Sequence, residues 1–270
     1  MTASTSMWNK RITTEQSQAR SGRERAFRAF CRGLVVAAAW LLLWELAARK
    51  VGLELLLPAP GSVLRALRRL VGTGEFWASI GRSMSRILLG YLLGSLSGLL
   101  LGAVTSRLRA AEAFLTPAMA AMKATPVASF VILLLVWIRG ANLSVAVSTI
   151  MVLPLVWQAT HTGLRAADPL LLEMAKAYGL KRRTVFRHII LPPARPQVLA
   201  ALRTALGFAW KAGVAGEVIA ISGGTIGSHL HDTKVYLEMP ELFAWTAVVI
   251  LISMLLERML VAVAEREGAQ

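Results

Sequence analysis

Long runs of apolar residues constrain this sequence more than any other feature. The clearest run is ILLGYLLGSLSGLLLGAVT, which carries no charged residue between Arg86 and Arg107. A helix of about 20 apolar residues crosses the hydrocarbon core of a bilayer, and a helix satisfies its own backbone hydrogen bonds in lipid. The 270-residue chain is 56% hydrophobic, whereas soluble domains are roughly 45–50% apolar. The sequence therefore predicts an all-α integral membrane protein.

Six segments have the length and hydropathy expected of membrane spans. They are predicted at residues 32–48, 86–105, 113–138, 142–160, 197–221 and 242–261. We expect one transmembrane domain over residues 33–265, preceded by a basic, disordered tail at residues 1–32. The tail is too long and too mixed for a signal peptide and lacks a clear cleavage site, so it is expected to be retained.

The distribution of positive charge predicts how the spans are oriented. With both termini on one side, the segments on that side hold 19 Lys and Arg residues, the segments on the other side hold nine, and two fall within spans. Positive residues are enriched on the cytoplasmic side, so we expect both termini in the cytoplasm of a bacterial cell with this chain in its inner membrane. The net charge of +15 also fits nucleic-acid binding, but no such motif occurs. The single cysteine, Cys31, excludes a disulfide within the chain.

The longest predicted cytoplasmic loop, at about residues 163–196, contains its own helix signals. Asp168 and Pro169 form a helix start, and Gly179 is a natural helix stop. A second helical stretch is expected up to Ile190, ended by the prolines at 192 and 193. The sequence predicts a helix, a glycine turn, a second helix and a proline entry into the fifth span.

This loop resembles a known motif. Glu173-Met174-Ala175 is followed by Gly179 after three residues, by Ile189 after nine more, and by Leu191-Pro192. The spacing is that of the EAA loop of ABC importer permeases, EAA-x3-G-x9-I-x-LP, with Met174 in place of an alanine. The stretches LPAPGSV and SMSRILLGYLLGSLSGLLLG are similar to the nitrate, sulfonate and taurine branch of that family. The resemblance covers roughly residues 40–262.

The resemblance implies a fold, partners and a transported solute. The fold would be that of type I (MetI-like) importer permeases, assembled as a homodimer with two cytoplasmic ATPase subunits and an extracytoplasmic binding protein. A heterodimer with another permease remains open. The solute would be a small anion such as a sulfonate, taurine or nitrate. By analogy, the loop docks on the ATPase through six residues: Glu173, Ala175, Ala177, Gly179, Leu191 and Pro192.

The chain itself is not expected to hydrolyse ATP or to hold a cofactor. A phosphate-binding Walker A loop requires Gly-Lys, and this dipeptide does not occur. ATP and Mg²⁺ would be bound by the partner ATPase, and this chain would not be an enzyme.

Two further features lie within the predicted spans. A stripe of glycines with a period of four permits close helix packing, inside one protomer or between two; it consists of Gly90, Gly94, Gly98 and Gly102. Lys211 and Glu217 lie in the fifth span, where charges usually face a cavity or a partner. We expect one of them to face a translocation path, with pairing to another helix as the alternative.

Other functions were weighed against these features. His229, His231 and Asp232 form a weak metal pattern, and no metal site is predicted, because metals need three or four ligands in a defined geometry. A secondary transporter without an ATPase partner is the main alternative; it predicts ion-coupling carboxylates in the spans and inverted repeats, whereas we identify only Glu45 and Glu217 as such carboxylates and no repeat is evident. A membrane enzyme would require a reactive cluster, and none is evident.

Overall fold

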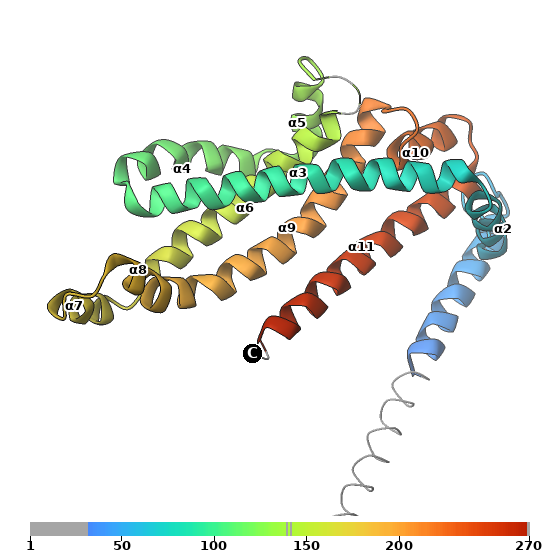
Figure 1. The fold of residues 1–270 in the computed structure, drawn as a ribbon. Helices are drawn as coiled ribbons and strands as arrows, with labels where there is room; N and C mark the ends of the chain where they lie inside the picture. The colour runs from blue at the N-terminus through green and yellow to red at the C-terminus, as the bar shows by residue number, and fades with distance from the viewer. Residues whose placement is uncertain (1–31, 139, 141, 269–270) are drawn as a thin grey trace, which may run out of the picture. The chain divides into compact units, whose positions relative to one another are not determined.

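The computed structural model describes residues 32–138, 140 and 142–268 (Figure 1). All regular elements of these described residues are helices. The all-α prediction is therefore confirmed. The chain groups into two compact units, with the boundary between Val63 and Leu64. Residues 1–31 of the predicted tail, Cys31 included, lie outside the described residues, and the single domain predicted for residues 33–265 stays a prediction.

The first unit contains a helix over residues 32–51. Its apolar side chains are largely exposed, among them Trp40 at 68% and Leu42 at 63%. Glu45 forms an ion pair with Arg49 at 2.7 Å, and Trp44 donates a hydrogen bond from Nε1 to the carbonyl oxygen of Pro58. This helix is not among those that qualify as membrane spans by length and composition, so the first span stays a prediction.

Helix α2 (Pro60–Val71) crosses the boundary between the units. It is amphipathic: Val63 and Ala66 are buried, whereas Arg65 and Arg68 are exposed. Pro60 begins this helix, at a position where the missing backbone N–H has no intrahelical partner to lose.

Four helical stretches are long and apolar enough to cross a membrane. They are α3 (Gly74–Arg107), α6 (Asn142–Arg165), α9 (Leu191–Ala220, counted from Arg182) and α11 (Met239–Gly268, of which Met239–Met259 qualifies). They correspond to the second, fourth, fifth and sixth predicted spans. The described part of the chain therefore contains several membrane-spanning helices.

The third predicted span is not one continuous helix. It consists of α4 (Arg109–Ala124) and α5 (Val127–Leu134), which are bent by 105° where they meet. Thr125 has extended backbone angles (φ −80°, ψ 128°), because the ring of a following proline disfavours the helical conformation. Pro117 lies inside α4 without ending it. The segment predicted as the third span is therefore bent at Pro126, and the two helices together still have the length and hydropathy of one span.

The glycine stripe of α3 packs against the backbone of α6. A Cβ atom at Gly90 would lie 2.5 Å from the carbonyl oxygen of Val145, and one at Gly102 would lie 2.6 Å from Cβ of Thr160. Gly94 and Gly98 make equally close approaches. The two helices therefore contact each other over about three turns within one protomer, where no larger side chain fits.

Helices α9 and α11 complete the packed body of the second unit. Ser148 of α6 donates to the carbonyl oxygen of Ala209 at 3.1 Å, and Trp210 donates from Nε1 to the carbonyl oxygen of Val249 on α11 at 3.1 Å. Trp210 and Trp245 are almost fully buried. These contacts fix α9 between α6 and α11.

Three short helices lie at the ends of this body. Helix α10 (Ile226–Val235) lies at one end of α9, whereas α7 (Pro169–Ala177) and α8 (Arg182–Val185) lie at the opposite end (Figure 1). A π-helical turn, η1 (Phe186–Ile190), joins α8 directly to α9.

The prolines after Ile190 do not end a helix. Helical structure continues from Arg182 to Ala220, and the backbone N–H of Leu191 bonds to the carbonyl oxygen of Phe186, five residues back. The wider π turn places Pro192 and Pro193 in the first turn of α9, where a proline breaks no hydrogen bond. The predicted break at these prolines was wrong for this reason.

Candidate functional site

In the loop between α6 and α9, capping residues that the sequence shows set the start and the end of α7. The Asp168 side chain accepts a hydrogen bond from the backbone N–H of Leu170 at 2.9 Å and begins α7. At the other end, Gly179 has φ +62°, the left-handed region that glycine adopts without strain. The backbone N–H of Leu180 bonds to the carbonyl oxygen of Ala175, and that of Gly179 bonds to Lys176. This is a Schellman cap, which turns the chain sharply towards α8.

The six docking residues predicted in the loop do not share one environment. Ala175 is buried, with 2% of its surface exposed, whereas Glu173, Ala177, Gly179, Leu191 and Pro192 are exposed. Gly179 has space around it, since a Cβ there would meet no atom within 4 Å. Ala175 therefore serves the packing of the loop itself, and the exposed residues are those available to a partner.

The exposed face of α7 is unusually apolar. Leu170, Met174 and Tyr178 follow one another at intervals of four residues and are 72%, 46% and 78% exposed. Positions four apart lie on one face of a helix, so these side chains form a continuous apolar ridge, which we call the α7 ridge. Exposed apolar surface of this kind is typical of a protein interface.

A basic groove lies on another face of α7, the one that carries Leu172, Ala175 and Lys176. Its open volume is about 690 Å³. The positive charges that line it come from α3, α7 and α8, namely Arg107, Lys176, Arg182 and Arg183. The loop therefore offers an apolar ridge and a positively charged groove on different faces of α7.

The two ends of the loop meet at a backbone contact that the sequence analysis missed. A Cβ at Gly163, near the end of α6, would lie 3.1 Å from Cα of Ala194, in the first turn of α9. Both residues are buried. A displacement of the loop is thus passed to both helices together. The only signal in the sequence was a small residue on each side of the loop.

A polar cluster near the same end ties α6 to α3 and α4. Arg165 Nη1 lies 2.8 Å from both carboxylate oxygens of Glu112, and His161 Nε2 lies 3.2 Å from the same carboxylate. The other ring nitrogen of His161 lies 3.0 Å from the hydroxyl of Thr105. Trp157 donates to that hydroxyl at 3.1 Å. These residues were not predicted, because the partners on different helices are 49 to 56 positions apart in the chain.

The structure does not bring Lys211 and Glu217 together. Glu217 is fully buried; its Oε2 accepts from Ser83 at 2.7 Å and from the backbone N–H of Gly227 at 3.3 Å. Gly227 lies in the first turn of α10, whose positive end favours a carboxylate. Glu217 of α9 thus contacts both α3 and α10, and its place on a translocation path stays a prediction.

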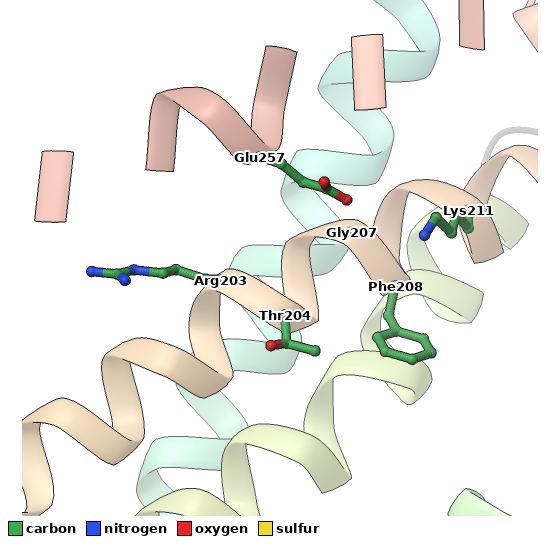
Figure 2. A pocket seen from close by; sticks show the side chains of 6 residues that line it. All are labelled: Arg203, Thr204, Gly207, Phe208, Lys211 and Glu257. Atoms are coloured by element: carbon green, nitrogen blue, oxygen red, sulfur yellow. The ribbon is translucent and has the colours of Figure 1, made fainter. Parts of the chain in front are cut away.

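Lys211, in contrast, lies on an exposed face of α9. It lines an open pocket with Arg203, Thr204, Gly207, Phe208 and Glu257 (Figure 2). Glu257 belongs to α11 and was overlooked as a carboxylate within a span, although it lies inside the sixth predicted segment.

The histidines of the weak metal pattern have different surroundings. His229 Nε2 lies 2.9 Å from the hydroxyl of Ser79, and its ring stacks on Trp245 with centroids 4.7 Å apart. His231 is two positions further along α10, on another side of the helix. Among the described residues there is no group of three or more His, Cys, Asp or Glu arranged to hold a metal ion.

Comparison with known proteins agrees with the loop and the fold. The putative aliphatic sulfonates transport permease SsuC of Bacillus subtilis is 26% identical over 240 residues, covering 87% of this chain and 84% of the relative. The taurine transport permease TauC of Escherichia coli is 26% identical over 220 residues, with 79% and 80% covered.

Two solved structures share the fold. An amino acid ABC transporter with histidines has a TM-score of 0.62 and 18% identity, covering 74% of this chain and 97% of that one. The inward-facing MetNI methionine ABC transporter has a TM-score of 0.60 and 13% identity, with 71% and 95% covered. This confirms the predicted type I (MetI-like) permease fold.

A family model matches residues 90–266, which include the glycine stripe, the loop, α9 and α11. This match covers more than half of the chain and includes the loop whose motif pointed to ABC importer permeases. The chain belongs to the family of binding-protein-dependent transport system inner membrane components, the permeases of ABC importers.

Proposed function

We propose that this chain is the translocating subunit of an ATP-driven importer and that α7 is its docking element for a cytoplasmic ATPase subunit. The observation that carries the proposal is the α7 ridge, in which Leu170, Met174 and Tyr178 are largely exposed at the end of a loop. Apolar side chains of this size are normally buried in a partner when they lie in one continuous patch outside the membrane.

The geometry of the loop supports a mechanical role. Loop and spanning helices are connected at Gly163 and Ala194, where α6 and α9 touch, and at Arg165, which is bound to Glu112 of α4. A partner that pulls or pushes α7 would therefore move α6, α9 and α4 together. Alternating access then follows as a two-state change that ATP binding biases from the cytoplasmic side.

The remaining parts of the assembly follow from the family. Two ATPase subunits would bind ATP and Mg²⁺, a second copy of this chain would complete the path, and an extracytoplasmic binding protein would deliver the solute. Both termini and the α7–α8 loop would be cytoplasmic. The solute is proposed to be a small sulfonate-like anion, because named relatives are aliphatic sulfonate and taurine permeases. Lys211 on the exposed face of α9 is the candidate cation of the path.

A co-purification experiment tests the docking role. Tagged wild-type protein is extracted from its native membranes in a mild detergent, and the proteins that accompany it are identified by mass spectrometry. Glu173→Ala removes an exposed carboxylate of α7, and Glu238→Ala is the matched control, because Glu238 is exposed just before α11. We expect an ATPase subunit with the wild type and the control, and about tenfold less with Glu173→Ala, the loss of one charge-assisted contact.

Two results would contradict the proposal. Equal recovery of the ATPase with all three proteins would show that Glu173 takes no part in docking. Absence of any ATPase, under conditions that keep a known importer complex intact, would favour a secondary transporter.

A further inference from the structure

The pocket between α9 and α11 contains charges that the proposed function does not yet explain. It is open, with a volume of about 350 Å³, and α9 provides five of its six lining residues. Glu257 of α11 is the sixth. A Cβ at Gly207 would lie 3.2 Å from Oε1 of Glu257, so the glycine lets this carboxylate approach the α9 backbone.

Two opposite charges of this pocket lie within spanning helices and have no partner. Lys211 lies in the stretch Arg182–Ala220 and Glu257 in Met239–Met259, both candidate spans. Within the described part of the chain, neither side chain forms an ion pair or a hydrogen bond. Charges at membrane depth are costly unless they face water, a partner or a ligand.

The two charges flank one opening. Figure 2 shows the ammonium end of Lys211 and the carboxylate of Glu257 directed towards the space beside Gly207, whereas Phe208 and Arg203 point away from it. Lys211 follows Gly207 by one helical turn, and Thr204 lies on the same exposed face as Lys211, seven positions earlier. A cation and a carboxylate on two facing helices are thus separated by open volume and are not joined in an ion pair.

We propose that this pocket is a transient binding site for the transported solute and that it selects an aminosulfonate, a small zwitterion with a sulfonate at one end and an ammonium at the other. This inference rests on the proposed function. The sulfonate would be bound by Lys211, and the ammonium would bind Glu257.

The carboxylate of Glu257 is the group in the pocket that would distinguish a zwitterion from a simple anion. A sulfonate without an ammonium group would gain the attraction of Lys211 but would be placed near the negative charge of Glu257, which repels it. A ligand with both charges compensates both protein groups at once.

Taurine and isethionate form a matched pair of probes, since they differ only in an ammonium group and a hydroxyl group at the end of the same two-carbon sulfonate. Binding of each is measured by titration calorimetry to the full-length chain in lipid nanodiscs. The variants are Glu257→Gln and Lys211→Met. Glu238→Gln and Lys234→Met are controls that change exposed residues of the same type outside the pocket.

We expect the wild type and both controls to bind taurine about tenfold or more tightly than isethionate. Glu257→Gln should weaken the binding of taurine about tenfold and leave the binding of isethionate unchanged or slightly stronger, so that the preference for taurine disappears. Lys211→Met should weaken the binding of both probes by about the same factor. Thermal unfolding of each variant, recorded in parallel, shows whether the fold is intact.

Several outcomes would overturn the inference. Equal binding of the two probes by the wild type, no binding of either, or a Glu257→Gln effect of the same size on both would each do so. Loss of thermal stability in each single variant with recovery in the double variant would assign Lys211 and Glu257 to an ion pair with each other or between copies. Because binding to nanodiscs requires no ATPase, failure here leaves the co-purification result standing, and failure of co-purification leaves this result standing.

Discussion

The two ends of α9 are each joined to short helices, but these helices are held in opposite ways. At one end, α10 is fixed by its own chain: Glu217 is fully buried, and Thr225 forms a reciprocal cap with Ser228. At the other end, α7 is almost entirely exposed, and of its residues only Ala175 is buried. One end has the surroundings of a protein core, and the other has the surface of an interface without its partner.

This difference indicates which end is expected to change during function. The buried hydrogen bonds that Glu217 accepts from Ser83 and Gly227 hold α10 to α3 and α9, so α10 should move as part of the body formed by α3, α9 and α11. The exposed α7 is connected to this body through a few contacts at the ends of the loop, of which Gly163 with Ala194 is the closest. Substitutions at the α10 end should therefore change stability, and substitutions at the α7 end should change coupling to a partner.

The largest effect is expected at Gly227 in α10. A Cβ there would lie 2.2 Å from Cβ of Glu217, a distance that forces the helices apart. Gly227→Ala should lower the free energy of unfolding by roughly 3 kcal/mol, measured by thermal unfolding of purified protein in detergent. Gly223→Ala is the control, because a Cβ at Gly223 meets no atom within 4 Å. Equal melting temperatures for both variants would show that α10 is not packed as described.

The α10 and α7 ends are compared most directly when the same substitution, glutamate to alanine, is made at each. Glu217→Ala leaves the hydroxyl of Ser83 and the N–H of Gly227 without an acceptor, and should cost about 2 kcal/mol of stability. Glu173→Ala, at an exposed position of α7, should change stability by less than about 0.5 kcal/mol yet reduce ATPase recovery. A stability loss at Glu173 as large as that at Glu217 would remove the distinction between the two ends.

A smaller effect is expected at the turn of the loop. Gly179 has φ +62° with open space around its Cα, so a side chain there is strained without clashing. Gly179→Val should cost about 1–2 kcal/mol locally and disturb the direction of α7, whereas Gly179→Asn should be tolerated because asparagine adopts this conformation more easily. ATP hydrolysis stimulated by the permease is the readout. Equal loss for both variants would assign Gly179 to direct contact with the ATPase.

A change in stability smaller than that at Gly179 is expected where the two ends of the loop touch. A Cβ at Gly163 would lie 3.1–3.3 Å from Ala194, close enough to separate α6 and α9 by a few tenths of an ångström. Gly163→Ala should cost under about 1 kcal/mol but lower solute uptake per ATP hydrolysed in reconstituted vesicles. Gly81→Ala, with no atom within 4 Å, is the control. An unchanged ratio of uptake to hydrolysis would mean that this contact does not transmit movement.

The parts of the molecule that depend on neighbouring residues could be predicted from the sequence. The start of α7 at Asp168-Pro169 and its end at Gly179 are set by local caps, and the four-residue glycine period placed one face of α3 correctly for close packing. Family membership followed from a motif within 20 residues. In each case the relevant atoms lie within a few positions of each other in the chain.

The parts of the molecule that depend on residues far apart in the chain could not be predicted from the sequence. Glu217 and Ser83 are 134 positions apart, so nothing near Glu217 in the sequence indicated that its carboxylate accepts hydrogen bonds from α3 and α10. Pro117 and Pro126 look alike in the sequence, yet only the second ends a helix. Glu257 could be assigned to the pocket only from the fold, because α11 places its carboxylate beside Gly207 of α9.

Cross-linking from the two ends tests the central claim most directly. Tyr178 follows α7 and Tyr236 follows α10, and they are 78% and 73% exposed. Each is changed to cysteine in a Cys31→Ser background, and a thiol cross-linker is applied in native membranes. We predict that Tyr178→Cys forms an adduct with an ATPase subunit that shifts when ATP is bound, and that Tyr236→Cys forms none. An ATPase adduct from Tyr236→Cys, or none from Tyr178→Cys while the subunits co-purify, would contradict the assignment of α7 as the docking end.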